Sequence, residues 1–186
     1  MILPLFRRKR QHDSIDRLYG TIVAQARLPV FYAGYGVPDT VEGRLDMIML
    51  HAVLLLHRVA SENDGLRGLG QAVFDRFCQD MDDNLREMGV GDLAVPRQMQ
   101  RIAGAFYGRA RVYQAALEAV DPSRLVDALR RNIYADEPAA EPSARRLATY
   151  VQGTVAHLRQ QDGATLSAGR LSYPEPAAAA ETATPS

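Results

Sequence analysis

Met47-Ile48-Met49-Leu50-His51-Ala52-Val53-Leu54-Leu55-Leu56 is the longest apolar run of the chain, and it decides the fold. A surface helix buries one apolar stripe, whereas a helix that is apolar on all sides is buried on all sides. The run is only about half of the roughly 20 residues that a helix needs to cross a bilayer. We therefore predict that it forms the central helix of a globular bundle and does not span a membrane.

The residues before this run predict how the central helix starts. Asp39 follows a proline and stands three residues before Glu42, which is the spacing of a capping box. The helix should continue to about Ala60. The preceding stretch, residues 30–37, is rich in glycine and aromatic residues, and we interpret it as a packed loop.

Apolar residues elsewhere recur at three- and four-residue spacing, which is typical of helices with one buried face. The first such helix should begin at Asp13 or Ser14. Gly89 fits the left-handed position after the end of a later helix. No segment alternates as a half-buried strand does, so the predicted fold class is all-α, a single compact bundle of about six helices. The expected helices cover residues 13–26, 39–60, 71–88, 96–120, 123–134 and 143–159.

Two glycines, Gly104 and Gly108, fall inside one of these predicted helices. Each costs roughly 1 kcal/mol relative to alanine in a helix interior. We expect either close contact with another helix or a break in this helix to explain them.

Length and composition indicate one domain. The chain has 186 residues with 22 basic and 22 acidic side chains, a balance that argues against a general nucleic-acid binder held by net positive charge. We divide it into a basic N-terminal arm (1–12), a helical domain (13–160) and a tail (161–186). The tail is rich in proline, alanine, glutamate and threonine, and we expect it to be disordered.

The N-terminal arm places apolar residues before basic ones, the reverse of a signal peptide. We expect the arm to be retained and its apolar and basic residues to be candidates for contact with an anionic membrane surface; a frayed terminus is the alternative. The only cysteine, Cys78, excludes an internal disulfide, and the cytoplasm is the expected location. The candidate membrane-contact residues are Leu5, Phe6, Arg7, Arg8, Lys9 and Arg10.

The sequence contains no recognisable catalytic signature. Its four histidines include no pair at i, i+4 spacing, and the Glu-x-x-His half-site of di-iron bundles is absent. The GxGxxG, Walker, CxxC and GxSxG patterns are absent too. We therefore expect no enzyme activity, no cofactor and no metal centre.

Three local features admit a functional interpretation beside a structural one. His51 could ligate haem, but we favour a core histidine bonded to a neighbouring carbonyl or carboxylate. Asp80, Asp83 and Glu87 share a helix face that could coordinate a cation, and we favour a solvated face partly neutralised by an Arg86–Asp82 pair. Cys78 belongs to an apolar stripe.

The string Phe106-Tyr107-Gly108-Arg109 places aromatic residues beside an arginine on a basic predicted helix. Such a helix could pair with phosphates of nucleic acid. We favour core packing of the aromatic rings, with Arg109 pairing with the acidic helix before it, and nucleic acid is the disfavoured partner.

Several unusual strings between about Leu18 and Tyr134 resemble the ubiquinol–cytochrome c chaperone family. They are Gly36-Val-Pro-Asp-Thr40, Glu42-Gly-Arg44, Asp46-Met47, His51, Asp80-Met-Asp82, Leu85-Arg-Glu-Met-Gly-Val-Gly-Asp92, Val95-Pro96 and Phe106-Tyr-Gly-Arg109. The resemblance implies a non-enzymatic assembly factor of the cytochrome bc1 complex, of the shorter bacterial form, whose protein client is cytochrome b.

A chaperone of a hydrophobic client needs an exposed apolar surface. We predict that aromatic residues form it and that charged residues at the helix ends supply polar contacts. The alternatives are a haem- or quinone-binding accessory protein of the same complex and an RNA-binding helical module in translation. The candidate aromatic residues are Phe31, Tyr32, Tyr35, Phe106 and Tyr107, and the candidate polar residues are Arg44, Asp46, Asp80, Asp83, Glu87 and Arg109.

Overall fold

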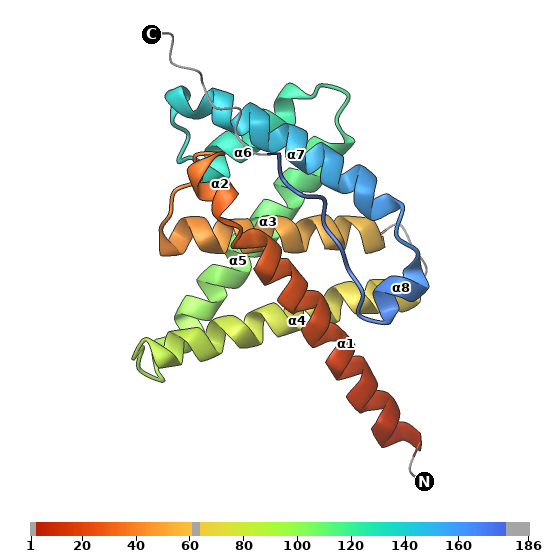
Figure 1. The fold of residues 1–186 in the computed structure, drawn as a ribbon. Helices are drawn as coiled ribbons and strands as arrows, with labels where there is room; N and C mark the ends of the chain where they lie inside the picture. Colours follow the sequence, from red (N-terminus) through yellow and green to blue (C-terminus); the bar gives the residue numbers. More distant parts are fainter. Residues whose placement is uncertain (1–2, 61–63, 178–186) are drawn as a thin grey trace.

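The computed structural model describes residues 3–60 and 64–177, and within these ranges every regular element is a helix. The all-α prediction is confirmed. Figure 1 shows long helices crossing one another around α3. The elements are α1 (Leu3–Ala26), α2 (Pro29–Ala33), α3 (Val41–Ala60), α4 (Asp64–Glu87), α5 (Val95–Glu118), α6 (Ser123–Ile133), the 3₁₀ helix η1 (Pro138–Ala140), α7 (Glu141–Arg159) and α8 (Gly163–Ser167).

Helix α3 is the centre of the bundle. It packs against α1, α4, α5, α6 and α7. Every side chain from Met47 to Leu55 is buried, as expected for a helix that is apolar all round. The prediction of a central helix from this run is confirmed.

The start of α3 differs from the predicted capping box. The backbone N–H of Gly43 donates to the Thr40 hydroxyl at 3.0 Å, so Thr40 is the capping residue. Asp39 instead forms an ion pair with Arg44 at 2.7 Å. The prediction was wrong by one position because threonine and aspartate are both good caps and only one of them can occupy the cap.

Helix α1 begins at Leu3, ten residues before the predicted start at Asp13. The backbone of most of the expected N-terminal arm therefore belongs to a helix. Figure 1 shows this end of α1 projecting beyond the other helices. Ser14, the alternative predicted cap, is buried inside the helix and accepts a hydrogen bond from Arg17 at 3.2 Å.

Helices α4 and α5 form a hairpin that Gly89 makes possible. Gly89 has φ of +81°. Its N–H bonds to the carbonyl of Arg86, and the next N–H, of Val90, bonds to the carbonyl of Leu85. These two bonds form a Schellman motif, and they confirm the predicted helix end.

The expectation for Gly104 and Gly108 was wrong. Helix α5 runs through both without a break, and a Cβ at either position would meet nothing within 4 Å. Both glycines are exposed on the outside of the bundle. No contact within the described residues accounts for their cost to helix stability.

The C-terminal region corrects the predicted disordered tail. Residues 163–167 form α8, and we call residues 168–177, which follow it without regular structure, the C-terminal segment. This segment packs on the helices: Leu171 and Tyr173 contact the core, and Pro176 is buried. The average composition of the tail does not reveal such contacts of individual side chains. Residues 178–186 lie outside the described ranges.

Candidate functional site

The aromatic stretch before α3 lies inside the protein. Pro29 starts the short helix α2, and Phe31 and Tyr35 are buried with exposed fractions of 0% and 2%. The Phe31 ring lies 5.4 Å from the His51 ring and 5.0 Å from the Tyr150 ring, centroid to centroid. The expected loop is a helical turn. The expectation that Phe31 and Tyr35 are exposed was wrong, because both rings pack inside the bundle against Tyr150 of α7.

His51 is a core histidine, as the structural interpretation predicted. Its Nδ1–H donates to the Met47 carbonyl at 2.8 Å, which leaves Nε2 to accept from the Tyr150 hydroxyl at 2.9 Å. Burial lowers the pKa of His51 to about 4, so the ring is neutral at pH 7. Both ring nitrogens are in hydrogen bonds, and neither is free to bind an iron atom.

The C-terminal segment covers this cluster of aromatic rings. The Tyr173 hydroxyl donates to the His51 carbonyl at 2.9 Å, and the two rings meet edge to face at 5.2 Å. Gln25 of α1 donates to the Pro174 carbonyl at 3.0 Å. We call Phe31, Tyr35, His51, Tyr150 and Tyr173 the closed aromatic cluster.

Two candidates next to this cluster remain at the surface. Arg44 is exposed, and its guanidinium lies 5.6 Å from the centre of the Tyr32 ring. Tyr32 is half-buried and donates its hydroxyl hydrogen bond to the Ala26 carbonyl at 2.8 Å. The structure thus brings these two predicted residues together, with Asp39 as the ion-pair partner of Arg44.

Asp46 and Arg109 join α3 to α5. Their ion pair is 2.6 Å long, and their side chains are only 13% and 21% exposed. Burial raises the pKa of Asp46 to about 6 even though the Arg109 charge lowers it. The predicted partner of Arg109 was the acidic helix α4; the actual partner lies on α3. Both residues therefore join two helices of the bundle, and neither is mainly a surface residue.

Two further buried polar atoms lie beside this ion pair. The Arg109 Nε and the Tyr113 hydroxyl are both buried, and neither has a hydrogen-bond partner among the described residues. Burial raises the pKa of Tyr113, so its phenol stays protonated. Buried polar atoms without a partner are exceptions in folded proteins, and two of them lie at the α3–α5 junction.

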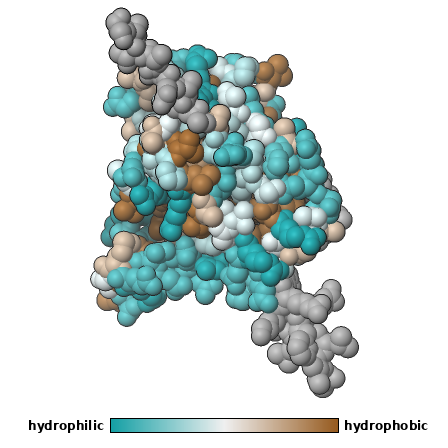
Figure 2. Space-filling model, in the orientation of Figure 1, coloured by the Kyte–Doolittle hydropathy of each residue, from teal (hydrophilic) through white to brown (hydrophobic). Residues whose placement is uncertain are grey.

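The acidic residues of α4 have different neighbours. Asp80 accepts a 2.9 Å hydrogen bond from Tyr19 and thereby ties α4 to α1. Asp83 and Glu87 are exposed, and Figure 2 shows a hydrophilic band along the α4 edge of the molecule. The predicted Arg86–Asp82 pair is present at 2.6 Å. No group of three potential metal ligands occurs in the part of the chain that the structure describes.

Phe106 and Tyr107 point in opposite directions. Phe106 is fully buried, with its ring 5.1 Å from that of Phe77, so its expected exposure was wrong. Tyr107 is 57% exposed and lies against the Phe74 ring at 4.9 Å. Tyr107 is the one predicted aromatic residue that lies mostly outside.

Tyr107 and Phe74 line an open groove between α3, α4 and α5, with a volume of about 450 Å³. Its floor is apolar. Gly70 lets α4 approach α3 there, because a Cβ at this position would lie only 3.1 Å from a Val59 methyl group. The remaining lining residues are Leu56, Ala60, Gln71 and Gln114. We call this the α3–α4–α5 groove.

Further apolar side chains are exposed at the α4–α5 turn and along α5. Met88 is 64% exposed and Leu93 is 99% exposed. Met88 lies at the end of the predicted third helix, and Leu93 lies in the turn that follows it. An apolar residue within a short polar turn was the signal that could have found Leu93.

The candidate membrane-contact residues Leu5–Arg10 lie on the projecting part of α1. The surroundings of their side chains are outside what the structure describes. No helix in the described ranges is long and apolar enough to cross a membrane.

Comparisons with known proteins agree on one family. A sequence profile described as ubiquinol–cytochrome c chaperone matches residues 33–173. The chain is also similar to a crystal structure described as the Cbp3 homolog from Brucella abortus, with 45% identity and a TM-score of 0.83 over 94% of this chain and 97% of that one. A comparison with curated protein sequences found no match. The chain therefore belongs to the ubiquinol–cytochrome c chaperone family.

Proposed function

We propose that this protein is a non-enzymatic assembly factor of the cytochrome bc1 complex and that it holds an apolar segment of cytochrome b in the α3–α4–α5 groove. Family membership supports the assembly role. The observation that carries the binding site is the exposure of Tyr107 at the rim of an apolar groove, which no described segment covers.

The groove has the properties expected of a surface for a hydrophobic client. Its floor contains Leu56 and Val59, and its wall contains the rings of Phe74 and Tyr107. Aromatic side chains of this kind supply much of the binding energy of protein interfaces. Gln71 and Gln114 in the same groove can bond polar groups of a bound segment.

The adjoining face of α5 also favours a bound helix. Gly104 and Gly108 stand one turn apart on the exposed side, where nothing limits the approach of another backbone. Val112 lies one turn further and is 37% exposed. A helix of the client could therefore lie against α5 more closely than larger side chains would permit.

Asp83 and Glu87 stay candidate polar contacts. Both are exposed on α4, and neither forms an ion pair with any described residue. We expect reversal of both charges to weaken client capture. Unchanged capture would exclude these two residues from the proposed site, which would then consist of the groove alone.

The proposal is tested by affinity capture of the tagged protein from crosslinked cells of its own source, with cytochrome b quantified by mass spectrometry. Tyr107→Ser should reduce the recovered cytochrome b by about tenfold, as expected for an aromatic interface residue. The control variant is Val120→Ser. Val120 follows α5, is fully exposed at 102% and does not line the groove, so this variant removes an exposed apolar side chain outside the proposed site. Equal recovery with both variants would contradict the proposed groove.

A further inference from the structure

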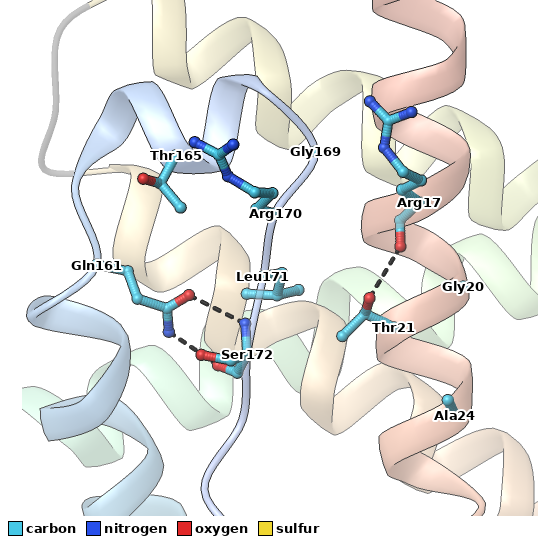
Figure 3. Close-up of a pocket in the computed structure, with 10 residues that line it drawn as sticks. All are labelled: Arg17, Gly20, Thr21, Ala24, Gln161, Thr165, Gly169, Arg170, Leu171 and Ser172. Atoms are coloured by element: carbon cyan, nitrogen blue, oxygen red, sulfur yellow. Dashed lines mark hydrogen bonds between the residues drawn. The ribbon is translucent and has the colours of Figure 1, made fainter.

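A second groove lies between α1 and the C-terminal segment, and it has a volume of about 560 Å³. Figure 3 shows Arg17, Gly20, Thr21 and Ala24 of α1 on one side and residues 169–172 on the other. Gln161 and Thr165 complete its lining. We call this the α1 groove.

The walls of the α1 groove are held in place by backbone and side-chain contacts. Gly169 has φ of +77°, and a Cβ there would lie 2.7 Å from the Ser14 Cα, so only glycine lets the chain approach α1 this closely. Gln161 binds Ser172 twice, donating to its carbonyl at 2.8 Å and accepting from its N–H at 3.0 Å. The groove therefore exists before any ligand arrives.

The charge of the α1 groove is positive. Its lining includes two arginines and no carboxylate. Arg17 makes two hydrogen bonds, to Ser14 and to the Ala168 carbonyl, both through Nη2, and its Nε and Nη1 make none with a described residue. Neither Arg17 nor Arg170 forms an ion pair with any side chain that the structure describes.

Arg17 and Arg170 line one groove that contains no carboxylate, whereas several other arginines of the bundle pair with carboxylates. Arg44, Arg76, Arg86, Arg109, Arg130 and Arg145 each have an acidic partner. Two acids adjoin lining residues of the α1 groove in sequence. Asp16 pairs with Arg76 at 2.8 Å. The carboxylate of Asp162 is bound by the Thr165 N–H at 2.8 Å and the Thr165 hydroxyl at 2.7 Å. The charge of Arg170 is the weakest of the influences on Asp162.

The lining of the α1 groove combines two arginines with small or apolar residues, which matches a ligand with an anionic head and an apolar body. The small or apolar residues are Gly20, Ala24 and Leu171. Guanidinium groups bind phosphate oxygens through paired N–H donors. We propose that the α1 groove binds a phosphate group, carried either by an anionic phospholipid or by a small soluble phosphate ester.

The direction of α1 favours a phospholipid as the carrier of this phosphate group. The same helix continues past Arg17 to an end that projects from the bundle, and its sequence there contains Arg7-Arg8-Lys9-Arg10. A lipid headgroup in the groove would place this basic end at the surface of an anionic membrane. The inference is independent of the proposed client groove, which lies on α3, α4 and α5.

The test combines a soluble probe with vesicles. Amide NMR spectra of the full chain are recorded during titration with glycerol 3-phosphate at constant ionic strength, and sedimentation is measured with phosphatidylglycerol–phosphatidylcholine vesicles. We expect saturable shifts at Gly20, Thr21 and Gly169, weakened at least fivefold by Arg170→Gln. Arg124→Gln is the charge-matched control, because Arg124 is exposed on α6 and forms no ion pair with a described residue.

Each outcome decides the proposal. Saturable shifts with glycerol 3-phosphate but equal vesicle binding by both variants identify a soluble ester as the ligand, whereas a selective loss of vesicle binding in Arg170→Gln identifies the lipid. Shifts that only follow ionic strength, together with equal vesicle binding by the two variants, overturn the site. Arg17→Lys provides a second check, since it keeps the charge and loses the paired donors. Capture of cytochrome b should be unchanged in Arg170→Gln, so failure here leaves the proposed function intact.

Discussion

The closed aromatic cluster and the α3–α4–α5 groove use similar side chains for opposite purposes. In the cluster, Phe31 and Tyr35 are covered by α2, α7 and the C-terminal segment. In the groove, Phe106 is covered but its neighbour Tyr107 is not. An aromatic-rich string therefore stays exposed, and so available for the proposed binding, only where no described segment covers it.

The largest expected effect is on the closed side of this comparison. Phe31→Ala should lower the free energy of unfolding by about 3–5 kcal/mol, because it removes a fully buried ring from a packed core. Urea denaturation measures this change. Tyr107→Ala is the partner variant, and it should cost no more than about 1 kcal/mol because its ring is mostly exposed. Similar costs for the two variants would contradict the assignment of inside and outside.

His51 should make the closed cluster sensitive to acid. Its pKa is about 4 in the folded protein and near 6.5 in the unfolded chain, so the unfolded state binds more protons between these values. Its contribution, up to about 3 kcal/mol, is fully present above pH 6.5 and is lost as the pH falls towards 4. Urea unfolding of wild type and His51→Gln across this range measures it, and identical pH slopes would argue against a neutral buried ring.

Asp46, which anchors the helix that carries Tyr107, should act in the opposite direction. Its pKa is about 6 in the folded protein, against an ordinary value near 4, so the folded state binds more protons between these values. Its contribution to stability therefore falls, by up to about 3 kcal/mol, as the pH rises from about 4 to 6. Asp46→Asn should remove this slope, although it also loses the ionised partner of Arg109. A slope that persists in the variant would assign the effect to another group.

A smaller effect should follow from loosening the cover of the closed cluster. Tyr173→Phe removes the hydrogen bond to the His51 carbonyl and should cost about 1 kcal/mol in the free energy of unfolding. Hydrogen exchange at the amides of residues 171–177 should accelerate. Unchanged exchange would mean that packing of the ring, rather than its hydroxyl, holds the C-terminal segment.

The smallest change in stability is expected on the open side, where it has the opposite sign. Gly108→Ala meets no atom within 4 Å and should stabilise α5 by up to about 1 kcal/mol. The same methyl group should reduce capture of cytochrome b if a client helix lies close to α5. Greater stability with undiminished capture would exclude this face of α5 from the binding surface.

The sequence predicted those parts of the fold that depend on local signals. The all-round apolar run at Met47–Leu55 and the left-handed glycine at Gly89 were both found where they were expected. The cap of α3 and the start of α1 were missed, because neighbouring threonine and aspartate are equivalent as caps and a helix can run through a potential cap.

Long-range burial was the main source of error in the candidate site. Whether Phe31 or Tyr107 is covered depends on segments more than a hundred residues away or on the neighbouring helices, and no local pattern reports this. The partner of Arg109 was missed for the same reason: Asp46 lies 63 positions earlier, and only the crossing of α3 and α5 brings them within 2.6 Å. His51 was interpreted correctly because its apolar surroundings are local.

The proposed binding surface is tested most directly with a photoreactive phenylalanine analogue at position 107 and, separately, at position 32. Both positions carry tyrosine, but Tyr107 stands at the open groove and Tyr32 beside the closed cluster. After illumination of cells, we expect a covalent adduct with cytochrome b from position 107 and little or none from position 32. An adduct from position 32 alone would overturn the proposed groove and would move the binding surface to the α2 side of the molecule.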